Sequence, residues 1–167
     1  MLFQRPLPKP WRRSVGSNPL LVVLAVIVAL LLINALYVAA EFATLSSRRA
    51  RLAQTAEEGN ALAALMLAIV EDPHRLDTYI AACQLGITLS SLVLGFYAQA
   101  TLSPVIAPWL EHLGISSGGA ALSLAATAIL LVLTSFQVVI GELVPKNIAV
   151  QYPERLALFT APPMRWS

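Results

Sequence analysis

The last long apolar run of the chain ends with an acid, a proline and a lysine: Glu142, Pro145 and Lys146. Proline has no N–H, so Pro145 in a helix leaves the carbonyl oxygen of Gly141 without its usual partner. That oxygen needs another partner in a bilayer, because no water is available at depth. The Glu142 carboxylate is next to Gly141 in the sequence. Two hard oxygens at a helix break suit a hard cation such as Mg²⁺ or Na⁺.

The same residues have a second interpretation, which the sequence leaves open. In it Glu142 lies at the membrane surface, Pro145 ends the helix and Lys146 reaches for lipid headgroups, as such residues commonly do at helix ends. Ser135 precedes Glu142 by seven residues and is therefore expected on the same helix face.

The apolar stretch 77–100 carries two lines of residues at helical spacing. The polar line consists of Gln84, Thr88 and Ser91, and the line of small residues consists of Ala82, Gly86 and Ser90. Small residues let helices approach closely, and hydroxyl groups can hydrogen-bond across the contact. In one interpretation these lines only pack helices together. In the other, the polar line supplies oxygens to a site inside the bundle.

The first apolar stretch has polar residues of its own. Asn34 and Glu41 are seven residues apart and share a helix face, with Tyr37 between them. Glu41 either points into the bundle or marks the membrane interface, and we expect it at the interface.

The composition indicates a membrane protein. Of the 167 residues, 57% are hydrophobic and 12% are charged, whereas soluble domains average about 25% charged residues. The net charge of +2 is small, and the basic residues are not interleaved with aromatic ones, so nucleic acid is not an expected partner. The single cysteine, Cys83, is expected to be a small buried hydrophobe. No nucleophile–base set, metal-ligand cluster or phosphate loop is visible, and we do not expect an enzyme.

The predicted fold is an all-α membrane protein with three transmembrane helices plus amphipathic juxtamembrane helices. The spans are expected at about 19–44, 77–100 and 120–144. An amphipathic helix at about 48–70 is predicted by apolar residues at i, i+3, i+4 and i+7: Leu62, Leu65, Met66 and Ile69. Residues 1–18, rich in proline and basic residues, are expected to lack fixed structure. The transmembrane domain then covers 19–161, and 162–167 belong to an element that the chain does not complete.

The stretch 101–119 contains Pro104, Pro108 and three glycines, which predict a loop or a short re-entrant piece. It has no lysine or arginine, whereas four arginines lie between the first two spans and three basic residues follow the third. The excess of basic residues in short loops marks the cytoplasmic side. We therefore expect 101–119 outside and the other two segments inside, although this places the basic N-terminus outside as well.

Three segments together resemble a known family. They are residues 34–43 (Asn-Ala-Leu-Tyr-Val-Ala-Ala-Glu-Phe-Ala) with Ser-Ser-Arg-Arg at 46–49, residues 82–92 (Ala-Cys-Gln-Leu-Gly-Ile-Thr-Leu-Ser-Ser-Leu), and residues 141–146 (Gly-Glu-Leu-Val-Pro-Lys). They resemble the transmembrane domain of the CNNM/CorC magnesium transporters, often labelled hemolysin-like in bacteria. The resemblance covers roughly residues 20 to 160.

The resemblance implies Na⁺-coupled Mg²⁺ export by a multi-pass homodimer of the plasma (inner) membrane, in contact with membrane lipid. It also implies nucleotide-binding CBS domains on the cytoplasmic side where the reading frame continues. The alternative is a non-transporting membrane scaffold or partner-binding module, a truncated relative of the family.

The resemblance further implies an ion site shared by the three spans. Glu142 matches the family's acid, and Gly141 and Pro145 match its helix break. The other implied ligands are Asn34, Thr88, Ser90 and Ser91, with supporting roles for Glu41, Gln84, Ser135 and Lys146. Two positions depart from many relatives, because Ala39 and Ala40 stand where a serine-containing segment is common. Ile87 and Ser91 likewise stand where some relatives have asparagines.

Overall fold

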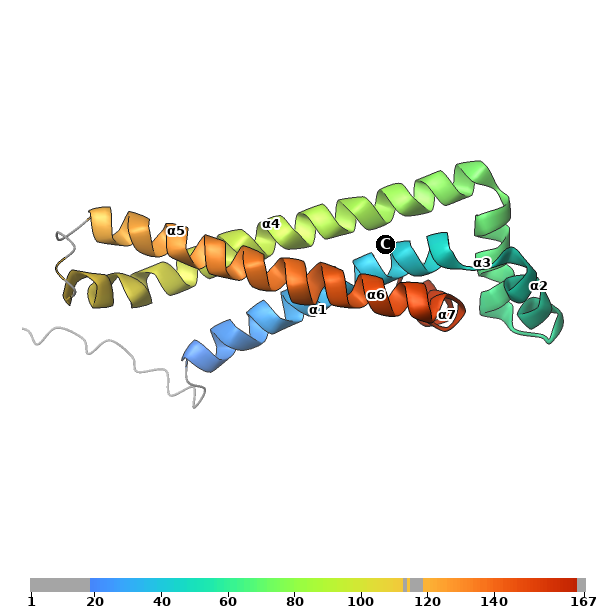
Figure 1. Cartoon of the computed structure of the whole chain (residues 1–167), viewed down its shortest axis with the longest axis horizontal. Coiled ribbons are helices and arrows are strands. Elements are labelled where there is room, and N and C mark those ends of the chain that lie inside the picture. The colour runs from blue at the N-terminus through green and yellow to red at the C-terminus, as the bar shows by residue number, and fades with distance from the viewer. Residues whose placement is uncertain (1–18, 113, 115–118, 165–167) are drawn as a thin grey trace, which may run out of the picture.

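The computed structural model describes residues 19–112, 114 and 119–164, and the elements in this part of the chain are helices (Figure 1). The predictions for residues 1–18 and for the chain end from 165 lie outside it. In chain order the elements are α1 (Pro19–Ser46), α2 (Arg49–Glu57), α3 (Ala61–Glu71), α4 (Pro73–His112), α5 (Gly119–Phe136), the π-helix η1 (Gln137–Leu143), α6 (Val144–Gln151) and α7 (Pro153–Met164).

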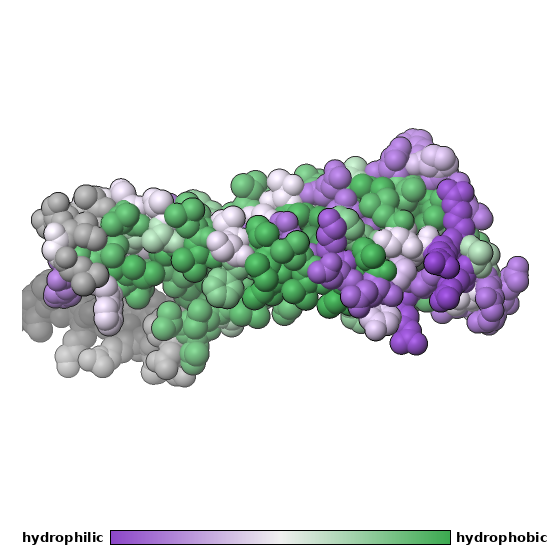
Figure 2. Space-filling view, viewed as in Figure 1, coloured by the Kyte–Doolittle hydropathy of each residue, from purple (hydrophilic) through white to green (hydrophobic). Residues whose placement is uncertain are grey.

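Three of the helical stretches are long and apolar enough to cross a membrane: Leu20–Ser46, Pro73–His112 and Leu122–Gln151. In each, only 17% of the most apolar window is buried inside the chain. The remaining apolar surface forms a band along the bundle, and polar residues gather at the end where α2 and α3 lie (Figure 2). Apolar side chains that face outward along a whole span are suited to lipid. The predicted all-α membrane fold with three transmembrane helices is therefore confirmed.

The second span differs from its prediction. A loop or re-entrant piece was expected after residue 100, but α4 continues through Pro104 and Pro108 to His112. Membrane helices tolerate proline where nearby hydroxyl groups and local adjustments compensate for the lost hydrogen bond. The carbonyls that lose a donor in α4 are those of Ala100 and Pro104, four residues before each proline. The nearby Ser103 and Thr101 hydroxyls donate to other carbonyls, those of Gln99 and Tyr97, at 2.6 and 2.7 Å.

The predicted amphipathic helix at 48–70 is two helices in the structure. Gly59, with φ of +93°, follows α2 in a conformation that favours glycine. Asn60 then caps α3, because its side-chain oxygen accepts from the backbone N–H groups of Leu62 and Ala63 at 3.0 and 3.2 Å. Asp72 caps α4 in the same way, as its carboxylate accepts from the N–H of His74 at 2.9 Å.

Two apolar cores hold the helices together. The core at the polar end is built from small and medium residues of α1, α2, α3, α6 and α7: Ala43, Leu52, Met66, Val70, Ala149, Ala157 and Ala161. The second lies between the spans and contains Ile27, Leu94, Ala98 and Ile129. Of the predicted apolar stripe on α3, Met66 is fully buried, whereas Leu65 is on the exposed side.

The close contact between α1 and α4 depends on a glycine. The Tyr37 ring on α1 lies against Gly86 on α4, and a Cβ atom at Gly86 would be 2.5 Å from Tyr37 Cε1. No real Cβ atom sits so close to a ring carbon, so any side chain at Gly86 must push the two helices apart. The line of small residues on α4 therefore packs helices at this position.

We predict that Gly86→Ala destabilises the protein by about 1–3 kcal/mol, because it overpacks the α1–α4 contact. Gly95→Ala is the matched control on the same helix, where the nearest atom to an added Cβ is Leu130 Cδ2 at 3.9 Å. Thermal unfolding in detergent should show a lower midpoint for the first variant and no loss for the second. Equal midpoints for both variants would contradict the packing role of Gly86.

Candidate ion site at the pi-helical turn

The third span contains a wide helical turn directly before Pro145. Residues Gln137–Leu143 form a π-helix, and the N–H of Val144 donates to the carbonyl of Val139, five residues back. The chain then continues as α6, with Pro145 in its first turn. The prediction was that the helix breaks at Pro145. In the structure the helix instead widens before Pro145 and continues through it. Such π-helical turns are rare, and inside α-helices they occur frequently at functional sites.

The carbonyl oxygen of Gly141 has the partner that the missing proline N–H predicts it should need. It accepts a hydrogen bond from the side-chain amide of Asn34 on α1, at 3.2 Å. Asn34 is fully buried. The interaction ties the first span to the third at the wide turn, which satisfies a backbone oxygen within the protein.

The other end of the Asn34 amide connects to the second span. Its oxygen accepts hydrogen bonds from the hydroxyls of Ser90 and Ser91, at 2.9 and 3.1 Å. Gln137 of the π-helix donates in turn to the Ser91 hydroxyl. One buried amide thus joins α1, α4 and η1 in a single hydrogen-bonded network.

The absence of a side chain at Gly141 favours this network. A Cβ atom there would be 3.0 Å from the Asn34 amide nitrogen. Gly141 is buried, so a side chain could not turn into open space. The absence of a side chain lets the Asn34 amide approach the backbone of the π-helix.

A pocket of about 510 Å³ adjoins the network between α4 and the third span. Glu142 is the one charged residue among those that line it, and it is partly buried. Ser91 and Gln137 belong to both the network and the pocket wall. The remaining polar lining comes from Thr134 and Gln99.

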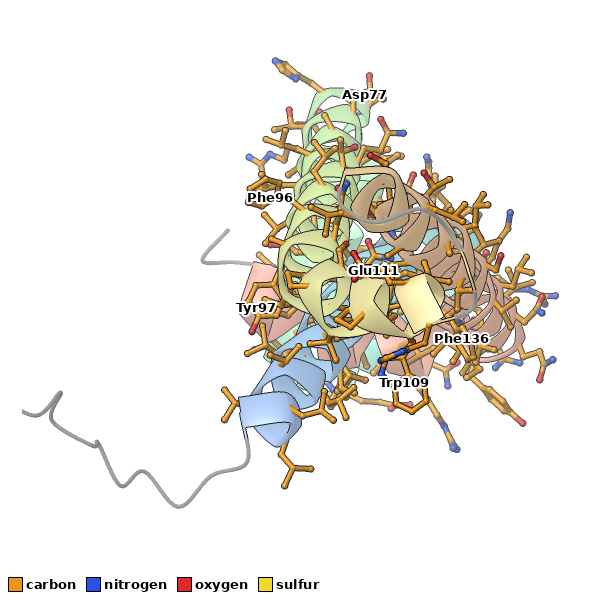
Figure 3. All side chains as sticks on the ribbon, turned by 90° about the vertical axis from the view of Figure 1, so that its left-hand side faces the viewer. Asp77, Phe96, Tyr97, Trp109, Glu111 and Phe136 are labelled. Carbon is orange, nitrogen blue, oxygen red and sulfur yellow. The ribbon has the colours of Figure 1, made fainter. Side chains whose placement is uncertain are left out.

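The pocket also has apolar walls, which include Phe96. Figure 3 views the bundle from the end where α4 stops and α5 begins, and shows Phe96 at the outer surface of α4. Its side chain is 75% exposed. The pocket is therefore open toward the periphery of this chain, where lipid or another protein surface would cover it.

Glu41 is not at the protein surface, contrary to our expectation that it marks the membrane interface. It is only 9% exposed. Gln84 on α4 donates to its carboxylate from the amide nitrogen, at the long distance of 3.5 Å. The packing of α4 and α7 against α1 encloses this part of the first span.

Three of the predicted residues are not brought to the network. Thr88 is exposed and donates to the carbonyl of Gln84 in its own helix. Ser135 is also exposed and bonds to Leu131 of its own helix, because the wide turn changes the phase between Ser135 and Glu142. The Lys146 ammonium lies over the Phe42 ring, 4.4 Å from its centroid.

The sequence reasoning missed Gln137 as a site residue. It stands in an apolar run and is only 9% exposed in the structure. A lone amide one turn before Gly141 was a usable signal, since a buried polar residue inside a span usually has a partner.

The site is rich in neutral oxygens and poor in charge. The network contains only neutral groups (Asn34, Ser90, Ser91, Gln137 and the Gly141 carbonyl), and the adjoining pocket adds one carboxylate, that of Glu142. In the part of the chain that the structure describes, no group of three or more His, Cys, Asp and Glu residues could hold a metal. Hydroxyl, amide and carbonyl oxygens with one acid suit a hard cation that is bound loosely.

Several curated proteins are similar to this chain. UPF0053 protein YhdT of Bacillus subtilis is 40% identical over 146 residues, which cover 87% of this chain and 30% of that protein. An uncharacterized protein of Mycobacterium tuberculosis is 39% identical over 141 residues, which cover 83% of this chain and 39% of that protein. The polyamine export protein of Haemophilus influenzae is 30% identical over 84% of this chain and 32% of its own length.

The chain thus spans about a third of the length of these relatives. A family profile gives a second, independent comparison. The profile described as "Cyclin M transmembrane N-terminal domain" (CNNM) matches residues 25–167. That range contains α1 from its second turn, the Asn34 network and the π-helix. The chain belongs to the CNNM transmembrane domain family.

Proposed function

We propose that this chain forms the ion-translocating domain of a membrane transporter that exports Mg²⁺ in exchange for Na⁺. The observation that carries the proposal is the pocket beside the π-helix, with the Glu142 carboxylate and the neutral oxygens of Ser91 and Gln137 in its wall. Family membership supports transport as the activity. Mg²⁺ and Na⁺ are the ions that the sequence resemblance implies.

The pocket suits a divalent cation that keeps part of its water. Mg²⁺ dehydrates reluctantly and is usually held by one or two carboxylates together with several waters. A volume of about 510 Å³ leaves room for that water. One carboxylate leaves the bound ion with a net positive charge, so the site does not hold it too tightly for release. A transporter requires such reversible binding.

We also propose the setting in which this domain works. It forms a homodimer in the plasma (inner) membrane, and it acts as a transporter without enzymatic activity of its own. In proteins of the length of the relatives, cytoplasmic CBS domains would regulate it. The open side of the Glu142 pocket is a surface that a second copy could cover.

An organic polycation is the second candidate cargo. One relative is named a polyamine export protein. Phe96 and Gln99 line the Glu142 pocket and also a neighbouring pocket of about 430 Å³. The two pockets together form a groove longer than one ion needs, with a carboxylate in one part and an aromatic ring between. An extended amine could use both features.

We predict that Glu142→Gln abolishes Mg²⁺ export without affecting membrane insertion, because it removes the charge of the pocket and keeps the side-chain volume. The measurement is Mg²⁺ release from loaded cells, with and without external Na⁺. Glu71→Gln is the matched control, since Glu71 is exposed on α3 and should leave release unchanged.

Release at the wild-type rate from Glu142→Gln would contradict the assigned cargo site. Parallel efflux of radiolabelled spermidine separates the two cargoes. If a correctly inserted full-length wild type released neither, the chain would instead be a scaffold.

We predict that Asn34→Ala lowers stability by about 1–3 kcal/mol, because the Gly141 carbonyl loses its buried donor and two serine hydroxyls lose their acceptor. Export should fall as well, since the π-helix is no longer held against α1. Asn147→Ala is the control, as Asn147 is exposed on α6. Thermal unfolding and Mg²⁺ release should both distinguish the two variants. An Asn34→Ala protein as stable as Asn147→Ala would show that the network is dispensable.

A further inference from the structure

A second polar contact joins α1 and α4 away from the Asn34 network. It consists of Glu41 on α1 and Gln84 on α4. Glu41 and Asn34 are seven residues apart, as are Gln84 and Ser91, which separates the two contacts by about 10 Å along the helices. The Tyr37 ring lies against Gly86 between them. The first and second spans are therefore joined by two polar contacts, the Asn34 network and the Glu41–Gln84 contact, with an aromatic ring between them.

Glu41 is only 9% exposed as a whole residue. In the described part of the chain, no lysine or arginine forms an ion pair with it. The other titratable groups near the Glu41–Gln84 contact are the Cys83 thiol and, beside it, the Tyr79 phenol, both on α4. Neither group carries a positive charge in any protonation state. A buried carboxylate without a positive partner is stabilised by a bound cation.

Gln84 donates its amide N–H to the Glu41 carboxylate. The distance of 3.5 Å exceeds the usual range for such a bond, so the carboxylate is held loosely and can exchange partners. Rotation of the Gln84 amide presents its oxygen instead of its nitrogen, which adds a second ligand beside the carboxylate. Gln84 is itself exposed, so an ion can reach the Glu41–Gln84 contact from outside the interface between α1 and α4.

We propose that Glu41 and Gln84 form a binding site for a monovalent cation, distinct from the Glu142 pocket. One carboxylate neutralises one monovalent cation completely. Because Gln84 is exposed, the bound ion keeps water in the positions that the carboxylate and the amide oxygen do not fill. A divalent ion would keep a net positive charge at this contact, which offers fewer neutral oxygens than the Glu142 pocket. The binding step stands by itself; its use as the coupling site of an exporter rests on the proposed function.

The first experiment uses the wild-type chain in lipid nanodiscs and follows its thermal unfolding midpoint. Na⁺ is raised at constant ionic strength against choline, with and without saturating Mg²⁺. An ion that binds only the folded state raises the midpoint in a saturable way. Two separate sites predict that Na⁺ raises the midpoint by a similar amount whether or not Mg²⁺ is present. A Na⁺ effect that disappears in saturating Mg²⁺ would overturn the proposal, because it would indicate one shared site.

The second experiment assigns the residues. Glu41→Gln should abolish the Na⁺ response and keep the Mg²⁺ response, whereas Glu142→Gln should do the reverse. Thr88→Ala, one turn from Gln84 on an exposed face, is the control and should keep both responses. Gln84→Ala retains the carboxylate and should weaken the apparent Na⁺ affinity about tenfold, which keeps the test available if Glu41→Gln does not fold.

A Na⁺ response that is unchanged in both Glu41→Gln and Gln84→Ala would overturn the site. A third outcome separates the two proposals. If the wild type responds to Na⁺ but not to Mg²⁺, and Glu41→Gln loses the Na⁺ response, the monovalent site is supported and the divalent cargo pocket is contradicted.

Discussion

The structure depends on the need to satisfy buried polar groups within the protein, and the Asn34 amide meets that need for three helices at once. Its nitrogen donates to the backbone of the π-helix and its oxygen accepts from two serines of α4. In a soluble protein, water could replace any of these partners. In a bilayer it cannot, so the amide fixes where the three spans meet.

The sequence predicted the elements that depend on local chemistry. The three spans follow from long apolar stretches. The need of the Gly141 carbonyl for a partner also followed from Pro145 alone. The identity of that partner did not, because Asn34 is 107 residues away in the sequence. Only the packing of the first span on the third decides it.

The features that the sequence did not predict have a shared physical cause. Helical spacing assumes a constant turn, so it grouped Ser135 with Glu142, but the π-helix changes the turn between them. Proline and glycine predicted a loop after residue 100, but α4 continues as a helix through Pro104 and Pro108, as membrane helices can. Glu41 was expected at the interface because a charge inside a span is costly, and its burial depends on α7, which the sequence does not place. In each case the tertiary environment outweighed a local rule.

The wide turn of the third span separates the helix into two parts that face different neighbours. Before it, α5 packs on α4; after it, α6 packs on α1. An i→i+5 turn contains one more residue than an α-turn, which rotates all later side chains by about 100° around the axis. The continuous helix formed by α5, η1 and α6 can in this way pack its second part, α6, on a different neighbour without a loop. If the π-turn shifts to another position along the helix, each residue that it passes must rotate about the helix axis. A shift of the wide turn by a few residues would therefore turn the side chains that it passes, Glu142 among them, about the helix axis, while the helix itself stayed continuous.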